Sequence, residues 1–183
     1  MTDAETIDPA DVAVVYARPA LLPAFCATLD IVARERMYIE MTEAPSQEQL
    51  ATFQMRMLAL NMPVFYALAG ERVLGWADIS AAGNPRLAHR GFLGMGLLPE
   101  ARGLGLGQKL LEAALTHARE QTSLEKVELL VFTSNIAAIG LYRKFGFEEI
   151  GVIRHFRKLD GVYFDCLEME LFLREQPTHL GVF

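Results

Sequence analysis

The chain has 183 residues, a length typical of one domain, and its 52% hydrophobic and 22% charged residues form an ordinary globular composition with enough material for a full core. Its 17 Lys and Arg against 23 Asp and Glu give a formal net charge of −6. Because binding extended phosphate surfaces needs a basic field, this balance argues against nucleic acid and anionic membranes as partners.

The first half of the chain combines strand and helix patterns within a single expected domain, 1–183. Apolar residues recur at intervals of three and four after Pro19, which suits the first turn of a helix. Ser46 and Gln49 have the spacing of a capping box that begins a second helix. The expected elements are a loose tail (1–10), a strand (11–17), a helix (19–36), a second helix (46–61) and two hairpin strands (64–69 and 73–80).

The second half contains the pattern of a parallel strand pair. The run from Lys126 to Phe132 is apolar on both faces, which predicts a central strand with a parallel neighbour. Asp160-Gly161 is a hairpin signal. The expected elements are a strand (90–98), a helix (105–122), a strand (126–132), a short helix (135–145) and two final strands (147–156 and 162–173). This order predicts an α+β fold of three layers, in which helices cover both faces of a mostly antiparallel mixed sheet with a central, right-handed, parallel βαβ unit.

A glycine-rich bend joins the strand 90–98 to the helix 105–122. Its sequence is Arg102-Gly103-Leu104-Gly105-Leu106-Gly107. Glycine allows close approach to the backbone, and a helix N-terminus offers unpaired N–H groups with a partial positive charge. The bend therefore predicts a phosphate site, with a turn that binds nothing as the structural alternative.

Three classes of phosphate ligand use such a bend. A P-loop needs Ser or Thr after its Lys, but Leu110 follows Lys109. A dinucleotide fingerprint needs a third glycine where Gln108 stands, and the chain is short for two nucleotide-binding halves. The turn that holds the pyrophosphate of coenzyme A reads (Gln/Arg)-x-x-Gly-x-(Gly/Ala), and Arg102, Gly105 and Gly107 match it.

A second motif follows about 30 residues later, with Asn135, Ala138, Leu141, Tyr142, Lys144, Gly146 and Phe147 at fixed positions. With the element order and the bend, it resembles the GNAT family of N-acetyltransferases over residues 10–173. The segments that contain Ala88-His89, Lys126–Leu129 and Arg157–Asp165 look like a bacterial branch that includes L-amino-acid N-acetyltransferases. The resemblance transfers fold and acyl donor better than the acceptor.

The resemblance implies a donor site for acetyl-CoA. Backbone N–H groups from Gly103 to Gln108 would hold the pyrophosphate, and the strand Met95–Leu98 would pair with the pantetheine arm. Arg102 would contact a phosphate or cap the loop, and Asn135 would contact the pantetheine arm or only cap its helix. The implied cofactor-binding residues are Met95, Gly96, Leu97, Leu98, Arg102, Gly103, Leu104, Gly105, Leu106, Gly107, Gln108, Asn135 and Tyr142.

The resemblance also implies catalytic roles. Tyr142 would donate a proton to the departing thiolate of coenzyme A. Many relatives carry a carboxylate base where this chain has Leu130. Glu128, Asp78 and His89 are the remaining candidates for a base, each with a structural alternative, and a water chain that ends at one of the carboxylates, Glu35 and Glu40 included, is a further possibility. Glu35 and Glu40 lie where the family usually contacts the acceptor, and apolar residues near them, if they face it, favour an apolar side chain.

Taken together, the expected activity is acetyl transfer from acetyl-CoA to a primary amine of a small molecule, a free amino acid among the acceptors, by direct attack in a ternary complex. The alternatives are a peptide or protein N-terminal acetyltransferase and a non-catalytic module that binds acyl-CoA. A homodimer through the final strands fits the resemblance.

The remaining composition signals are negative. Cys26 and Cys166 form no CxxC and predict two reduced thiols in the core, neither placed as a covalent acyl carrier. The four histidines show no metal-ligand spacing, so no metal is expected. The sequence has no apolar run of 18 residues and no signal-peptide pattern at its start, which predicts a cytoplasmic protein.

Overall fold

A single seven-stranded mixed sheet forms the centre of the molecule. The computed structural model describes residues 7–174, so residues 1–6 of the expected tail lie outside the described part. The strand order is β1-β2-β3-β4-β5-β7-β6, and only β4 and β5 pair in parallel. The strands are β1 (Ala13–Tyr16), β2 (Val64–Ala69), β3 (Arg72–Ala81), β4 (Arg90–Leu97), β5 (Lys126–Phe132), β6 (Glu148–Leu159) and β7 (Val162–Phe172).

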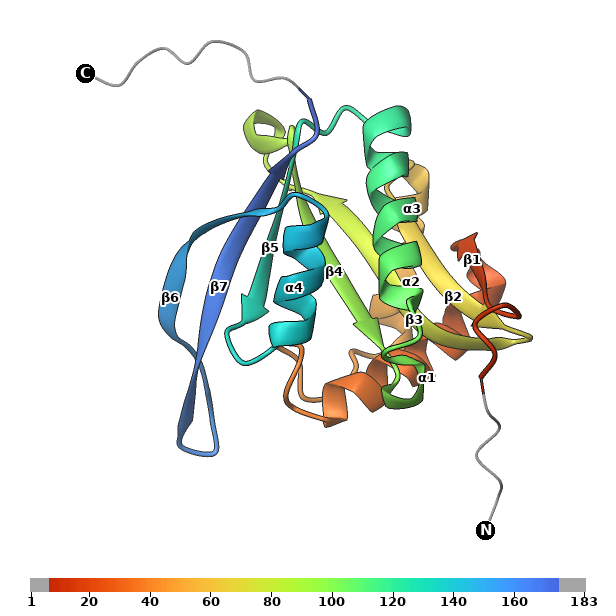
Figure 1. Cartoon of the computed structure of the whole chain (residues 1–183). Helices are drawn as coiled ribbons and strands as arrows, with labels where there is room; N and C mark the ends of the chain where they lie inside the picture. Colours follow the sequence, from red (N-terminus) through yellow and green to blue (C-terminus); the bar gives the residue numbers. More distant parts are fainter. Residues whose placement is uncertain (1–6, 175–183) are drawn as a thin grey trace.

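Helices cover both faces of this sheet, which confirms the expected α+β architecture in three layers. In Figure 1, α3 and α4 lie on one face, and α1 and α2 lie on the other. The capping box of α2 is formed as predicted, because the Gln49 N–H donates to Ser46 Oγ at 3.3 Å and the Ser46 N–H donates to Gln49 Oε1 at 3.0 Å. The helices are α1 (Leu22–Arg34), α2 (Gln47–Ala59), α3 (Leu106–Gln121) and α4 (Ile136–Lys144), with short 3-10 turns η1 (Pro19–Leu21), η2 (Pro85–Leu87) and η3 (Pro99–Ala101). Within residues 7–174, no helix combines the length and the apolar character that a membrane span requires.

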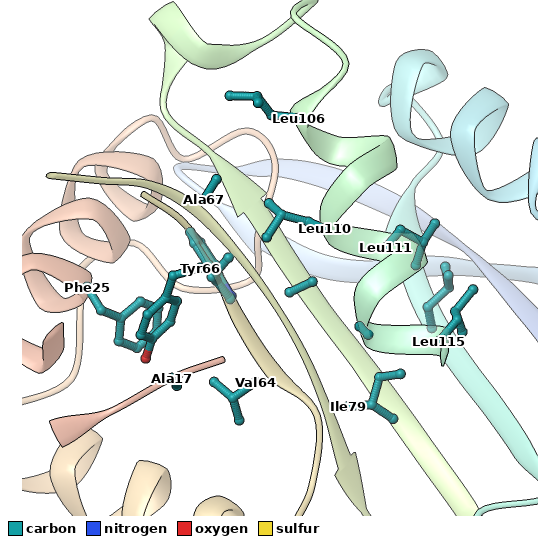
Figure 2. Packing of buried hydrophobic residues seen from close by; sticks show 14 of the residues in the cluster. Ala17, Phe25, Val64, Tyr66, Ala67, Ile79, Leu106, Leu110, Leu111 and Leu115 are labelled. Atoms are coloured by element: carbon teal, nitrogen blue, oxygen red, sulfur yellow. The ribbon is translucent and has the colours of Figure 1, made fainter. Parts of the chain in front are cut away.

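The hydrophobic core fixes where α3 begins. Leu106, Leu110 and Leu111 of α3 are fully buried against one face of the central strands, as Figure 2 shows. On the other face, Phe25 of α1 stacks on Tyr66 of β2 with 5.0 Å between ring centroids (Figure 2). Burying a leucine side chain stabilises the fold by about 2 kcal/mol. Because Leu106 is buried in the first turn, the N-terminus of α3 is held at the end of β4.

An opening in the sheet lies next to that helix N-terminus. β4 and β5 pair only from Arg90↔Lys126 to Phe92↔Glu128. Beyond Phe92 the two strands diverge, as the ribbon in Figure 1 shows. The second half of β4 therefore has no strand partner on its β5 side.

The hairpin of β6 and β7 contains the expected turn and one unexpected irregularity. Asp160 and Gly161 have φ angles of 49° and 83°, which suits a two-residue hairpin turn. β6 ends at Leu159 instead of the predicted Phe156. The reason is a bulge between Ile153 and Arg157, after which pairing with β7 resumes.

Candidate active site

A cavity of about 1120 Å³ lies at the point where β4 and β5 diverge. Its wall combines residues from both faces of the sheet, such as Trp76 and Asp78 from β3 and Tyr142 from α4. The expected site residues that line it are Asp78, Met95, Gly96, Leu97, Arg102, Gly103, Gly105, Gly107, Gln108, Asn135 and Tyr142. The cavity therefore brings together the bend, the open edge of β4 and two candidate catalytic groups.

The bend at 103–108 presents a row of unused donors. Gly103 and Gly105 both have φ of +76°, a left-handed conformation that glycine adopts without strain. Lys109 is the first residue of the helix whose N–H is bonded, to the Gly105 carbonyl at 3.2 Å. Within residues 7–174, none of the N–H groups from Gly103 to Gln108 has an acceptor. Six neighbouring free donors at a helix N-terminus form an anion site.

The surroundings of the bend suit a negatively charged group. The first turn of α3, Leu106-Gly107-Gln108-Lys109, carries no acidic residue. Lys144 lies beside it, because its Nζ donates to Gln108 Oε1 at 2.6 Å. The side chains of Leu104 and Leu106 pack into the core, so these two residues can offer a ligand only their N–H groups. A diphosphate fits this combination of donors and charge.

The open edge of β4 offers further backbone groups. The Leu98 N–H donates to the Leu74 carbonyl of β3 at 2.8 Å. Because main-chain groups alternate in direction along a strand, the N–H groups of Met95 and Leu97 point away from β3, into the gap that opens after the last β5 pairing at Phe92↔Glu128. An extended ligand could pair with them as an added strand.

This geometry corrects part of the expected donor strand. Leu98 cannot contribute, because its N–H is bonded to Leu74, its carbonyl accepts the Ala101 N–H at 2.9 Å, and its side chain is buried. Gly96 contributes in another way, since its main chain faces β3. A Cβ on Gly96 would lie 2.4 Å from the Trp76 ring, so the missing side chain lets the indole pack against the strand.

Arg102 lines the cavity, but its guanidinium forms hydrogen bonds with other residues of the protein. It donates twice to the Leu97 carbonyl, at 3.1 and 2.9 Å, and forms two hydrogen bonds with the Glu35 carboxylate, at 2.8 and 2.5 Å. It also lies over the Tyr38 ring at 4.4 Å. Of the two expected roles, this arrangement matches capping, because four of the five guanidinium N–H groups tie the bend to the Leu97 carbonyl and to Glu35 at the end of α1.

Tyr142 presents a free hydroxyl to the cavity. Its side chain is buried beside Phe147, with ring centroids 5.7 Å apart. Among residues 7–174 the hydroxyl has no hydrogen-bond partner, yet it is not sealed away from the cavity. Burial raises the pKa of the Tyr142 phenol, so it stays protonated at every working pH. The geometry provides one hydrogen-bond donor for a ligand atom.

Asn135 caps α4 through its side-chain oxygen, and its side-chain NH₂ group remains available as a donor. Its Oδ1 accepts the Ala138 N–H at 3.2 Å. Its Nδ2 donates to no acceptor within the described residues, and the residue lines the cavity. The capping role and the ligand contact, which the sequence left as alternatives, are therefore compatible in one side chain.

Asp78 lies in the cavity wall in a setting that suits a base. Its side chain lies opposite Gly94, where a Cβ would approach its Oδ1 to 3.2 Å. Burial raises the pKa of Asp78 to about 7, with the Trp76 indole opposing the shift. No ion-pair partner of Asp78 lies within residues 7–174. A carboxyl that titrates near neutral pH can accept a proton from a bound ligand.

The raised pKa of Asp78 predicts a pH-dependent effect of Asp78→Asn on stability. The folded state holds the proton more tightly than the unfolded chain, so stability decreases as pH rises from about 4 to 7. A tenfold difference in proton affinity corresponds to about 1.4 kcal/mol, so the penalty has an upper limit of about 4 kcal/mol. Asp78→Asn should raise Tm at pH 8 and leave it unchanged near pH 4, measured by thermal denaturation. An equal Tm change at both pH values would contradict this origin.

Two candidate bases lie away from the cavity. His89 is exposed at the start of β4, whereas the gap opens at the other end of that strand. Glu128 is buried in the paired region, where it binds Arg90 at 2.6 Å and Lys126 at 2.9 Å. Burial alone raises the pKa of Glu128, but hydrogen bonds from Arg90 and Lys126 outweigh it and hold this pKa below its usual value. Neither position supports a base that touches a ligand in the cavity.

Sequence reasoning missed the roles of two residues, one in the cavity wall and one outside it. Cys166 is buried, as expected, but it lies in the cavity wall because β7 pairs it with Phe132. Arg157 donates to the carbonyls of Arg36 and Ile39 at 2.6 and 3.0 Å, and so holds the segment between α1 and α2. The Arg157 contacts depend on the β6 bulge, which has no clear sequence signal.

Comparisons with known proteins agree with this geometry. A family model described as the acetyltransferase (GNAT) family matches residues 30–147. An N-alpha-acetyltransferase from Sulfurisphaera tokodaii is 40% identical over 82 residues, which cover 44% of this chain and 49% of that protein. The chain therefore matches about half the length of this curated relative.

Two solved structures share the fold. An acetyltransferase of the GNAT family from Streptococcus pneumoniae has a TM-score of 0.82 and 25% identity, covering 88% of this chain and 99% of that chain. A phosphinothricin acetyltransferase from Sinorhizobium meliloti, solved in complex with acetyl-CoA, has a TM-score of 0.78 and 22% identity, covering 93% and 95%. Enzymes of this family take their acetyl group from acetyl-CoA. Because the family model spans more than half of the sequence and includes the bend and α4, the chain belongs to the acetyltransferase (GNAT) family.

Proposed function

We propose that this enzyme transfers an acetyl group from acetyl-CoA to the primary amine of a small molecule, by direct attack in a ternary complex. The observation that carries the proposal is the row of free N–H groups at 103–108 beside the open edge of β4. The first feature would hold the pyrophosphate of coenzyme A, and the second would hold its pantetheine arm. The thioester would then lie in the cavity that Asp78 and Tyr142 line.

The residues of the cavity provide the proton transfers. Bound acetyl-CoA supplies an activated acetyl thioester. Asp78 accepts the proton that the amine loses as its nitrogen forms the new bond to carbon. Free N–H groups of β4 donate hydrogen bonds to the carbonyl oxygen as negative charge develops there. Tyr142 donates its proton toward the departing sulfur.

Gly105→Ala should weaken coenzyme A binding about fivefold or more, because a Cβ in a left-handed conformation costs about 1 kcal/mol and shifts the N–H groups from their positions. The matched control is Gly161→Ala, which has a similar φ of +83° and equally open surroundings in a remote turn. Calorimetry with coenzyme A should show weaker binding for the first variant and unchanged binding for the second. Equal affinities would contradict the role of the bend.

Cys166→Ala should retain most of the activity. A covalent route would need a reactive thiolate, but burial, followed by the charge of Glu40, raises the pKa of the Cys166 thiol to about 11. Steady-state kinetics of this variant, with treatment of the wild type by iodoacetamide as a second probe, would check the prediction. Loss of turnover together with an acetylated Cys166 in mass spectrometry would support a ping-pong route instead.

A peptide N-terminus is the second candidate acceptor. The name of the relative from Sulfurisphaera tokodaii favours it, although that match covers less than half of this chain. A thiol-release screen with acetyl-CoA separates the candidates, using amino acids, polyamines, aminoglycosides and short peptides as acceptors. Binding of coenzyme A without thiol release from any amine would leave only a non-catalytic acyl-CoA module.

A further inference from the structure

Two pairs of aromatic side chains line the cavity. Trp76 of β3 packs edge-on against Phe25 of α1, with 5.7 Å between ring centroids. Phe132 of β5 packs against Phe156 of β6 at 6.4 Å. These pairs come from opposite sides of the gap between β4 and β5, so a molecule beside Asp78 would contact aromatic surface. Such a wall favours an apolar or aromatic body on the acceptor.

The acidic and basic side chains of the cavity wall differ in whether they already have a partner. Four charged residues line it: Glu40, Asp78, Arg102 and Lys144. Both cations already have partners, since Arg102 binds Glu35 and the Leu97 carbonyl, and Lys144 binds Gln108 beside the bend. Neither Glu40 nor Asp78 has an ion-pair partner within residues 7–174. Among the described wall residues, Glu40 and Asp78 therefore lack an ion pair and Arg102 has one, whereas the Lys144 ammonium binds only the neutral Gln108 amide and lies at the bend, where a diphosphate would use its charge.

Arg157, the other nearby cation, is held outside the cavity. Its Nη atoms donate to the carbonyls of Arg36 and Ile39. Its guanidinium lies over the rings of Phe132 and Phe164, at 4.6 and 4.3 Å. The Arg157 Nε is buried without a partner, so nothing in the cavity can reach it. While it holds this segment, Arg157 therefore acts on an acidic group of the acceptor only through its charge at a distance and not through an ion pair.

The negative charge of Glu40 affects a second residue of the cavity wall, Cys166. After burial, it is the next cause of the raised pKa of the Cys166 thiol in the cavity wall, where it outweighs the opposing charge of Arg157. A carboxylate on the acceptor would therefore meet repulsion from Glu40 and Asp78, while Arg157 stays bound to carbonyl groups and Lys144 lies at the bend. At the short distances within one pocket, such repulsion costs about tenfold or more in affinity.

We propose that the acceptor is a primary amine on an apolar, aromatic-sized body with no carboxylate beside the amine, and that Glu40 acts against α-amino acids. The proposal rests on the N-acetyltransferase function proposed above and narrows it, because it removes free amino acids from the favoured acceptors. A free arylalkylamine and the N-terminus of a peptide share this chemistry. In each of them the amine is the nucleophile, and the carbon next to it bears no carboxylate.

Three acceptors with the same benzyl group test the proposal on the full chain with acetyl-CoA: phenethylamine, phenylalanine and the dipeptide amide Phe-Ala-NH₂. We expect kcat/KM for phenylalanine to be about tenfold or more below that for phenethylamine, whose amine has a similar basicity. The kcat/KM for the dipeptide amide, relative to that for phenethylamine, then shows whether a peptide N-terminus or a free amine is the better acceptor. Phenylalanine used as well as phenethylamine would overturn the proposal.

Glu40→Gln tests the residue named. It should lower the ratio of kcat/KM for phenethylamine to that for phenylalanine by about threefold or more. Glu43→Gln, an exposed change in the same segment outside the cavity wall, should leave the ratio unchanged. A ratio that does not respond to Glu40→Gln would overturn the role of Glu40.

Thiol release with spermidine but with none of the benzyl compounds would overturn the apolar acceptor alone, whereas no release with any amine would remove the N-acetyltransferase function itself.

Discussion

Replacement of Tyr142 by Phe should lower kcat by about 100-fold and leave the affinity for acetyl-CoA nearly unchanged. The variant keeps the ring that packs on Phe147 and removes only the hydroxyl, which has no partner within residues 7–174. Because burial keeps the Tyr142 phenol protonated, its proton is available at every pH at which the enzyme works. Burial also makes a thiolate at this place more basic, so proton donation to the departing sulfur is favoured.

The measurement is the rate of thiol release at saturating acetyl-CoA, with calorimetry to follow binding. Tyr163→Phe is the matched control, since Tyr163 is 50% exposed on β7 and lies outside the main cavity. Full turnover by Tyr142→Phe under conditions where chemistry limits the rate would remove the proton-donor role. A parallel loss of binding and turnover would instead indicate that the hydroxyl positions the ligand.

Asp78→Asn should have the second large effect, a loss of kcat/KM whose size depends on pH. The pKa of Asp78 is about 7, so the wild-type carboxylate is available above neutral pH and protonated below it. The kcat/KM of the wild type should therefore level off above about pH 7 and decrease tenfold per pH unit below it. Without the base, the amine must lose its proton to water first. The kcat/KM of the variant should then rise tenfold per pH unit up to the pKa of the amine, near 10.

At pH 7.5 the two profiles should differ by about 100-fold. Asp11→Asn is the matched control, because Asp11 is exposed near β1 and distant from the cavity wall. A variant with the wild-type profile would exclude Asp78 as the base and would leave a water chain to another carboxylate. The opposite effects on activity and stability are characteristic of a functional group that the fold holds at a cost.

The local parts of the site could be predicted from the sequence. The bend, the cap at Asn135 and the placement of Tyr142 depend on short segments whose glycines, capping groups and helical period act over a few residues. The capping box at Ser46 and the turn at Asp160-Gly161 were predictable for the same reason, and both are present. The α+β sheet followed from the order of these segments.

The parts that the sequence left open depend on contacts between distant segments. Arg102 turns away from the bend because Glu35, 67 positions earlier, accepts its hydrogen bonds. Cys166 enters the cavity wall only because β7 pairs with β5. The raised pKa of Asp78 requires the burial that several elements create together.

His89 is the instructive exception, because its placement follows from strand direction alone. β4 runs from Arg90 toward the bend, and the gap opens only after Phe92. A residue that precedes β4 therefore lies at the paired end, away from the cavity. The direction of β4, which can be read from the sequence, therefore argues against His89 as a ligand contact.

The most direct measurement is a crystal structure of the enzyme with acetyl-CoA. We expect diphosphate oxygens within hydrogen-bond distance of the N–H groups of residues 103–108, and a pantetheine arm paired with Met95 in the gap beside β5. The thioester should then lie within the cavity, between the Asp78 carboxylate and the Tyr142 hydroxyl. A diphosphate bound elsewhere, or a bend whose N–H groups are filled by the protein's own side chains, would contradict the account.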